Sequence, residues 1–301
     1  MDRISEMATF VAIIEEGSLA AAARRIGRSP PAVTRILAAL EQRLGIRLIQ
    51  RTTRRLSATD AGQRFFVSCQ RLLAQLDDIE QAAAGAGATP RGRLRITAPS
   101  LFGRLHVAPV VGAFLDRYPD VQVELVLLDR VVELIDEGFD LAVRIGHLPD
   151  SSLVVRKVAT VRRVLCASPA YLARAGAPTS PHDLVRHDIV AFTGTGSAEA
   201  WRFRANERTV TVPVKPRLSV NQADAAVAAA LEGRGITRIL SYQLALAPAG
   251  ALTLLLEPFE PEPLPVQLVY PAHRLVAPSV RAFVDAAVAG LARSIALPEV
   301  R

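Results

Sequence analysis

The sequence predicts a chain with three parts: an α-helical winged helix-turn-helix domain, a long linker helix, and an α/β domain made of two lobes. Three observations predict this order. Positive charge is concentrated between residues 24 and 55, and apolar residues recur at coiled-coil spacing between residues 65 and 79. From residue 94 onward, short strands alternate with helices. The 301 residues are enough for two or three domains.

A helix-turn-helix is predicted between residues 18 and 44. Ser18 is suited to cap the first helix, and Gly27 is suited to end it because glycine adopts positive φ angles without a steric clash. Ser29 then caps the second helix, and the two prolines that follow fit only in its first turn, where no backbone N–H is needed. An amphipathic helix over residues 1–16 is expected to pack behind both helices.

The second helix has an apolar face, with residues at helical spacing from Val33 to Leu44, and a polar face that can reach DNA. Hydroxyl and guanidinium groups recognise base edges, and proline rings can contact thymine methyl groups. The residues expected to read bases are Ser29, Pro31, Thr34 and Arg35. Phosphate contacts are expected from Arg28, Arg51, Thr53 and Arg54, with Ser18 also on the DNA-binding surface.

The charge of this segment also indicates nucleic-acid binding. Residues 24–55 contain nine arginines and a single acid, Glu41, so the segment carries +8 in a chain whose formal net charge is +7. The remainder of the chain is therefore close to neutral. A local basic patch of this kind is typical of phosphate binding. The alternative is a solvated basic helical hairpin that contacts no nucleic acid.

Four motifs resemble those of the LysR-type transcriptional regulators. They are Phe10–Gly17 (FVAIIEEG), Ser18–Arg25 (SLAAAARR), Ser29–Leu44, and Arg51–Gly62 (RTTRRLSATDAG). The chain departs from the family's pattern at Ile36, where a polar residue is expected. The resemblance extends at lower specificity over the whole chain. It implies a regulator that binds double-stranded operator DNA and a small-molecule effector, with RNA polymerase as a further partner.

A long helix is predicted after Thr59, with Asp60 at its positive end. Apolar residues recur along it at an average spacing of 3.5, the period of a coiled-coil seam. The seam residues are Phe65, Cys69, Leu72, Leu76 and Ile79. We expect a second copy of the chain to cover this seam, which would place two recognition helices about one turn of DNA apart. Packing against the chain's own second domain is the alternative.

The resemblance gives this helix the role of a dimerising linker, and it implies that two dimers commonly form a tetramer. Residues 82–92 are rich in small and turn-forming residues and are expected to form a hinge. The predicted parts are residues 1–58 for the winged helix-turn-helix domain, 59–88 for the linker and hinge, and 89–301 for the effector-binding domain.

The α/β domain is predicted to contain a mostly parallel sheet, because its strands alternate with helices. Residues 201–214 are expected to form a β-hairpin. Two α/β lobes joined by crossing strands resemble a periplasmic-binding-protein-like domain, which is the layout of the family's effector domain. The double crossing is taken from this resemblance. The expected lobes are residues 91–167 with 266–301 for lobe I, and residues 168–265 for lobe II.

Ligands in open α/β sheets bind outside the carboxyl ends of strands. Ser100 starts a helix there, where free N–H groups attract an anion, and Arg130 follows the next strand and can pair with a carboxylate. Thr193 follows a strand of lobe II, and Asn221 and Thr237 match positions that line the family's pocket. The five residues predict a small anionic effector between the lobes. Ordinary caps and loop residues are the alternative for each.

An enzyme and an exported solute-binding protein are the two alternative classes. The chain contains no GxSxG, HExxH, P-loop or GxGxxG sequence, and His182 and His187 lack the i, i+4 spacing of a zinc pair. A solute-binding protein would need an export signal and would have no use for the basic segment. We therefore expect no catalytic residue, no metal site and no cofactor.

Cysteine usage and hydropathy indicate the compartment. Cys69 and Cys166 lie far apart in the chain, so neither a disulfide framework nor a zinc site is expected and a reducing environment fits best. No apolar stretch reaches the ~18 residues of a membrane-spanning helix. The expected location is the cytoplasm, with no membrane partner.

Overall fold

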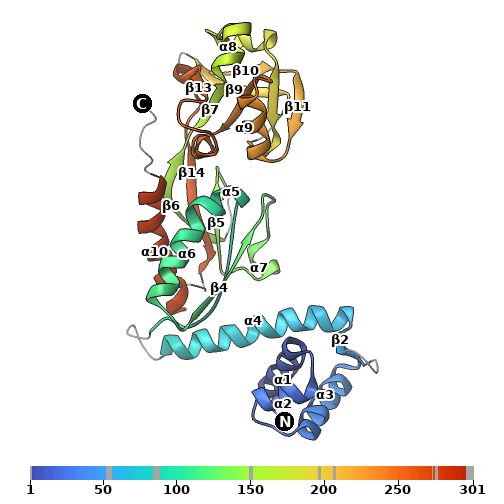
Figure 1. The fold of residues 1–301 in the computed structure, drawn as a ribbon. Helices are drawn as coiled ribbons and strands as arrows, with labels where there is room; N and C mark the ends of the chain where they lie inside the picture. Colours follow the sequence, from blue (N-terminus) through green and yellow to red (C-terminus); the bar gives the residue numbers. More distant parts are fainter. Residues whose placement is uncertain are drawn as a thin grey trace. The chain divides into compact units, whose positions relative to one another are not determined.

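The computed structural model describes residues 2–51, 56–83, 89–148, 152–195, 198–205, 208–272, 274 and 277–295. These divide into two compact units, Met1–Arg93 with Leu275–Ser279 and Leu94–Arg274 with Val280–Arg301 (Figure 1). Within the described ranges, every helix is too short or too polar to span a lipid bilayer. Residues 84–88 of the predicted hinge lie outside these ranges.

Three helices enclose the core of the first unit, as the sequence predicted. They are α1 (Arg3–Glu16), α2 (Leu19–Arg25) and α3 (Pro30–Leu44). The side chains of Phe10, Ile13 and Leu37 are buried between them. Helices α1 and α3 both end at a glycine in the left-handed conformation, Gly17 with φ 61° and Gly45 with φ 68°, which other residues adopt only with strain.

The wing is a two-stranded antiparallel sheet that follows α3. Its strands are β1 (Ile49–Arg51) and β2 (Leu56–Ala58). One carboxylate oxygen of Glu41 accepts the backbone N–H groups of Leu48 and Ile49, at 2.7 and 3.1 Å. The only acid of the basic segment therefore ties the start of the wing to α3, which explains why an acid occurs there.

Helix α4 (Asp60–Ala83) begins where the sequence predicted it. The Thr59 hydroxyl accepts the N–H of Gly62 at 2.9 Å and donates to the carbonyl of Arg47 at 2.9 Å. Gly62 lies directly against the chain entering the wing, since a Cβ atom added to it would lie 2.0 Å from the Leu48 carbonyl oxygen. This close approach fixes the angle at which α4 leaves the wing.

Two of the five residues in the expected coiled-coil seam on α4 are already packed against the same chain. The Phe65 ring lies 5.5 Å from the ring of Phe10, and Cys69 is only 2% exposed in the same core. Their assignment to an interface with a second copy is therefore corrected, because α1 fills these positions. Leu72 and Ile79, farther along α4, are 44% and 63% exposed.

The second unit contains a mixed five-stranded sheet in each lobe, among the residues described. The order is β4-β3-β5-β14-β6 in lobe I and β11-β8-β12-β7-β13 in lobe II. The strands of lobe I are β3 (Gly92–Ala98), β4 (Val121–Leu127), β5 (Leu141–Ile145), β6 (Leu153–Val161) and β14 (Leu264–Pro271). Those of lobe II are β7 (Arg163–Ala167), β8 (Ile189–Phe192), β11 (Pro216–Val220), β12 (Ile236–Leu240) and β13 (Thr253–Leu255).

The sheets are mixed rather than mostly parallel, which corrects the sequence-based expectation. Strand β3 runs parallel to β5, and β8 parallel to β11 and β12. In contrast, β14 is antiparallel to β5 and β6, and β7 is antiparallel to β12 and β13. The antiparallel pairs involve the strands next to the two crossings between the lobes. Strand β6 of lobe I leads into β7 of lobe II, and the chain returns to lobe I at β14. Lobe II therefore begins at Arg163, not near residue 168.

Helices pack on both sheets, in agreement with the predicted α/β class. Lobe I carries a continuous helical run of α5 (Ser100–Phe102), a π-helical turn (Gly103–Val107) and α6 (Ala108–Arg117), together with α7 (Leu134–Glu137) and α10 (Pro278–Ile295). Lobe II carries α8 (Pro169–Ala175), α9 (Ala223–Leu231) and the predicted hairpin, β9 (Ala200–Ala205) with β10 (Arg208–Pro213). Short 3₁₀ turns are formed by Pro181–Arg186, Thr193–Thr195, Ser241–Leu246 and Glu257–Phe259.

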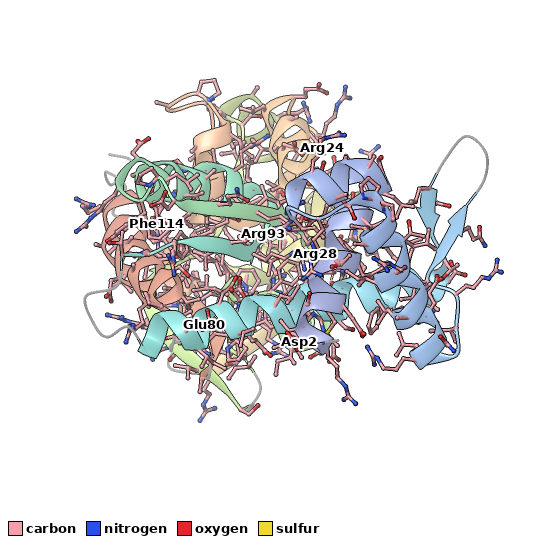
Figure 2. All side chains as sticks on the ribbon, turned by 90° about the horizontal axis from the view of Figure 1, so that it is seen from below. Asp2, Arg24, Arg28, Glu80, Arg93 and Phe114 are labelled. Carbon is pink, nitrogen blue, oxygen red and sulfur yellow. The ribbon has the colours of Figure 1, made fainter. Side chains whose placement is uncertain are left out.

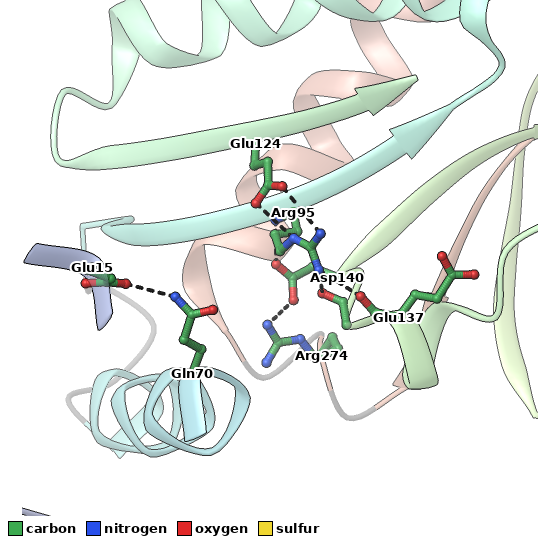
Figure 3. Close-up of polar contacts among 8 residues, drawn as sticks. Glu15, Gln70, Arg95, Glu124, Glu137, Asp140 and Arg274 are labelled. Carbon is green, nitrogen blue, oxygen red and sulfur yellow. Dashed lines mark hydrogen bonds and ion pairs between the residues drawn. The ribbon is translucent and has the colours of Figure 1, made fainter. Parts of the chain in front are cut away.

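A polar network joins the strands of lobe I at one end of the sheet (Figure 3). The Arg95 guanidinium on β3 donates to the carboxylate of Glu124 on β4 at 2.9 Å and to the carbonyl of Glu137 at 2.7 Å. The Asp140 carboxylate accepts the backbone N–H of Arg95 at 2.8 Å and pairs with Arg274. These charges are satisfied within the lobe, so the network stabilises the sheet of lobe I.

The contact at Gly62 can be tested by adding one methyl group. Gly62→Ala places a carbon against the Leu48 carbonyl, and the displaced backbone is expected to cost about 1–3 kcal/mol of stability in the first unit. Gly112→Ala on α6 is the control, because nothing lies within 4 Å of its added carbon. Urea unfolding of both variants would measure the difference. Equal stability of the two would contradict the contact.

Candidate nucleic-acid interface and effector cleft

The predicted base-reading residues lie on the accessible start of α3. Ser29, Pro31 and Arg35 are exposed, and Thr34 is half-buried with its hydroxyl donating to the Pro30 carbonyl at 3.1 Å. Ser29 occupies the N-cap position, but among the described residues its side chain makes no capping hydrogen bond. The predicted capping by this hydroxyl is therefore wrong, and the group remains free to contact DNA.

Ser18 and Ile36 contribute to structure rather than to the exposed face. The Ser18 hydroxyl accepts the N–H of Ala21 at 3.4 Å and caps α2, as the sequence predicted. Ile36 is fully buried. Its departure from the family's polar residue therefore removes no group from the exposed surface of α3, and it adds an apolar side chain to the core.

Helix α1 neutralises part of the basic segment. Arg25 forms ion pairs with Glu15 and Glu16 at 2.7 and 3.3 Å, and Arg43 pairs with the nearly buried Glu6 at 2.7 Å. The hydrogen bonds of Glu15 also raise the pKa of Arg25. These acids lie before residue 24, so a count of charge within the segment overstates the charge that the surface offers to phosphates.

The remaining arginines provide the basic surface. Those that are exposed and form no ion pair with any described residue are Arg24, Arg35 and Arg47. Arg28 is exposed and donates to the Ser5 hydroxyl at 3.1 Å; both Arg24 and Arg28 are labelled in Figure 2. The side chain of Arg51 and the residues Thr53 and Arg54 lie outside the described part of the chain, so their phosphate contacts stay predictions.

A cleft of about 750 Å³ lies between the two lobes of the second unit. Lobe I lines it with the turns after β3, β4 and β5, and lobe II with β7, the β9–β10 hairpin and the start of α9. Of the five residues predicted to bind an effector, Arg130 and Asn221 line this cleft. Its volume lies within the range of small-molecule sites.

The other three predicted residues are absent from the lining of the cleft. Ser100 lines an adjoining hollow of about 250 Å³, which shares Leu101 and Gln222 with the cleft, and its backbone N–H donates to the Asp129 carboxylate at 2.8 Å. The donor expected to attract an anion is therefore occupied by the chain itself. The Thr193 hydroxyl donates to the Val220 carbonyl at 3.3 Å, and Thr237 is fully buried within β12.

Arg130 is less available to bind a ligand than its position in the lining of the cleft suggests. Its guanidinium forms a two-bond ion pair with Glu137, at 2.5 and 2.8 Å. These bonds raise the pKa of Arg130 and lower the pKa of Glu137. Arg130 therefore already has a partner in the absence of a ligand, and it borders the cleft as part of a neutral pair.

Four arginines of the cleft escaped the sequence analysis. They are Arg144, Arg163, Arg202 and Arg204. Arg144 lies near the carboxyl end of β5, so the same rule that selected Ser100 could have selected it. Arg163 begins β7 and Arg202 lies in β9, and only the crossing of the chain between lobes brings them to the cleft.

His106, His187 and both cysteines are packed against other side chains, whereas His147 and His182 are exposed. His106 is 5% exposed, and its Nδ1 lies 2.7 Å from the Ser294 hydroxyl; His187 Nδ1 lies 3.1 Å from the hydroxyl of Tyr171. Burial raises the pKa of Cys69 to about 11 and that of Cys166 to about 12. Within the described residues, no three His, Cys, Asp or Glu side chains are grouped to bind a metal ion.

Comparison with known families assigns both parts of the chain. Residues 4–63 match the model of the bacterial regulatory helix-turn-helix proteins of the lysR family, and residues 87–292 match the LysR substrate binding domain. The chain belongs to the LysR family of transcriptional regulators. The family and the fold class that the sequence motifs predicted are thereby confirmed.

Individual transcriptional regulators resemble the chain over nearly its full length. An HTH-type transcriptional repressor of Pseudomonas aeruginosa (strain UCBPP-PA14) is 35% identical, over 95% of this chain and 91% of that protein. PtxR, an HTH-type transcriptional regulator of Pseudomonas aeruginosa, is also 35% identical, over 94% and 91%. The structure of CrgA, a LysR-type regulator from Neisseria meningitidis, is 30% identical with a TM-score of 0.61, covering 97% and 99%.

Arg35 offers a direct test of base recognition by α3. Its exposed guanidinium has no partner among the described residues, so Arg35→Ala is expected to cost about 1–3 kcal/mol of specific binding and to relax preference at one base pair. Competition binding on duplexes changed at single positions would measure this. Arg281→Ala, an exposed arginine of α10, controls for the loss of one charge. An equal loss on specific and random duplexes would assign Arg35 to phosphate contact.

Proposed function

We propose that this LysR-type regulator binds operator DNA as a dimer and that a small anionic effector, bound between its lobes, changes the complex with DNA. The observation that carries the proposal is the cleft of about 750 Å³, whose walls come from both lobes and contain five arginines. A ligand held by both walls favours one angle between the lobes. Such a ligand shifts the equilibrium by its difference in affinity for the two states.

In the proposed complex, the start of α3 enters the major groove. Bases are read by Ser29, Pro31, Thr34 and Arg35, with the proline ring against thymine methyl groups. Phosphates are bound by Arg28 and by the wing, through Arg51, Thr53 and Arg54. The exposure of Ser29, Pro31 and Arg35 supports this assignment.

The proposed dimer is formed through the exposed part of α4. Leu72 and Ile79 are the large apolar side chains of this helix that remain most exposed among the described residues, and the half-buried Leu76 lies between them in sequence. Pairing this face with a second copy removes apolar surface from water. Formation of a tetramer, contact with RNA polymerase and a cytoplasmic location are further parts of the proposal that rest on family membership.

The DNA-binding part is tested by fluorescence anisotropy on the duplex upstream of the protein's own gene, beside a scrambled duplex. We expect a preference for the upstream duplex of roughly 10³ or more, and a steep decrease of affinity with salt concentration. Arg54→Ala is expected to reduce the slope of log affinity against log salt by about one, because one phosphate contact is lost. Equal affinity for both duplexes would overturn sequence-specific regulation.

The dimer is tested by the double variant Leu72→Asp with Ile79→Asp. Two carboxylates on the exposed seam are expected to prevent pairing, so sedimentation velocity should find monomers with little affinity for the upstream duplex. Val185→Asp is the control, since this residue is 62% exposed, outside α4 and outside the lining of the cleft. A double variant that still sediments as a dimer would rule out the seam as the interface.

A further inference from the structure

Arginine is unusually frequent in the wall of the cleft. The lining contains five arginines and two acids, Asp129 and Glu262. Two of the arginines have partners, because Arg130 pairs with Glu137, and Arg204 lies 3.6 Å from Glu262. The Asp129 carboxylate accepts the N–H of Ser100. The remaining guanidinium groups therefore give the cleft an excess of positive charge.

Three arginines account for this excess. Arg144, Arg163 and Arg202 form no ion pair with any described residue. The Nη2 atom of Arg144 and the Nε atom of Arg163 are buried without a hydrogen-bond partner in the described structure. An unsatisfied buried donor on a charged group is costly, so such groups indicate a position where a ligand supplies the missing acceptor.

Lobe II adds a further charge behind its wall. Arg238, on β12, is 5% exposed and stacks on the Trp201 ring, with its guanidinium carbon 4.9 Å from the ring centre. Burial, with a smaller effect from Arg163, lowers the pKa of Arg238 to about 10, and burial also lowers the pKa of Arg163, with a smaller effect from Arg202. The three cations of lobe II repel one another, and an anion at Arg163 and Arg202 would relieve that repulsion.

The three arginines that form no ion pair with a described residue are divided between the lobes. Burial lowers the pKa of Arg144, and the charge of Glu137 acts on this arginine but only partly offsets the effect of burial. Arg144 belongs to β5 of lobe I, whereas Arg163 and Arg202 belong to β7 and β9 of lobe II. The same cavity is also lined by apolar side chains, among them Leu101, Leu128 and Phe192. The hydrocarbon part of a ligand would pack against these apolar side chains, and its two ends would face cations from the two lobes.

We propose that the effector carries two anionic groups joined by an apolar spacer, of the dicarboxylate class, with one group bound by Arg144 of lobe I and the other by Arg163 and Arg202 of lobe II. This inference rests on the proposed function, since it specifies the ligand of that same cleft. Guanidinium groups bind carboxylates through paired N–H donors, which gives each end a fixed orientation. A ligand bound at both ends links the lobes directly.

The test is a calorimetric titration of the full-length protein with α,ω-dicarboxylates from succinate to suberate. The monocarboxylate of each chain length and inorganic phosphate serve as probes with a single anionic group. We expect at least one dicarboxylate to bind at least tenfold more tightly than the corresponding monocarboxylate and than phosphate. Similar affinity for both carboxylate series would overturn the two-group proposal. Tighter binding of phosphate would instead indicate a single subsite for a phosphate group.

Variants identify the residues that bind each end. Arg144→Gln and Arg163→Gln are each expected to weaken binding of the selected dicarboxylate tenfold or more. Without ligand, both should unfold at the same or a higher temperature than the unchanged protein, because each removes a guanidinium with a buried nitrogen that has no hydrogen-bond partner among the described residues. Arg281→Gln in lobe I and Arg208→Gln in lobe II are matched controls, since both residues are exposed and outside the cleft. A loss of affinity explained by unfolding would count against a binding role.

The dicarboxylate titration and the DNA-binding test can fail independently of each other. If the protein prefers its upstream duplex but binds no dicarboxylate, the two-anion inference is wrong and the DNA-binding function stands. If a dicarboxylate binds through Arg144 and Arg163 but both duplexes bind equally, the inference stands and sequence-specific regulation fails.

Discussion

The effector domain depends on the path of its chain between two sheets. Only Arg162 separates β6 of lobe I from β7 of lobe II, and β14 later returns to pair with β5 and β6. The first crossing is therefore almost continuous strand, whereas the return from β13 to β14 passes through the turn Glu257–Phe259 and residues 260–263. The same crossing brings Arg163 to the wall facing Arg144. The position of the cleft and the charges within it therefore have one structural origin.

The DNA-binding unit also depends on a small number of contacts within the chain. Glu41 holds the start of the wing, Thr59 and Gly62 set the start of α4, and α1 supplies the acids that pair with Arg25 and Arg43. Each of these hydrogen bonds and ion pairs satisfies a polar group within the unit, so that group is not available to contact DNA. The exposed groups on α3 that have no partner in the unit are therefore only some of the charged and polar groups in the basic segment.

Local signals in the sequence were sufficient for the helix-turn-helix, the start of α4, the β-hairpin and the α/β class, because caps, prolines and apolar periodicity act within a few residues. Sequence order could not give strand direction, so the sheets were wrongly expected to be mostly parallel. It also could not reveal what covers Phe65 and Cys69, or that Asp129 occupies the N–H of Ser100, since these contacts join distant residues. Arg163 and Arg202 were missed for the same reason.

The bond from Ser100 to Asp129 has a consequence for selectivity. A carboxylate attached to the chain is always present beside that helix start, so it competes with any free anion as an internal ligand at high effective concentration. Small monoanions that are abundant in metabolism, such as acetate, must displace it and gain little in exchange. The Ser100 N–H is thereby withheld from free anions.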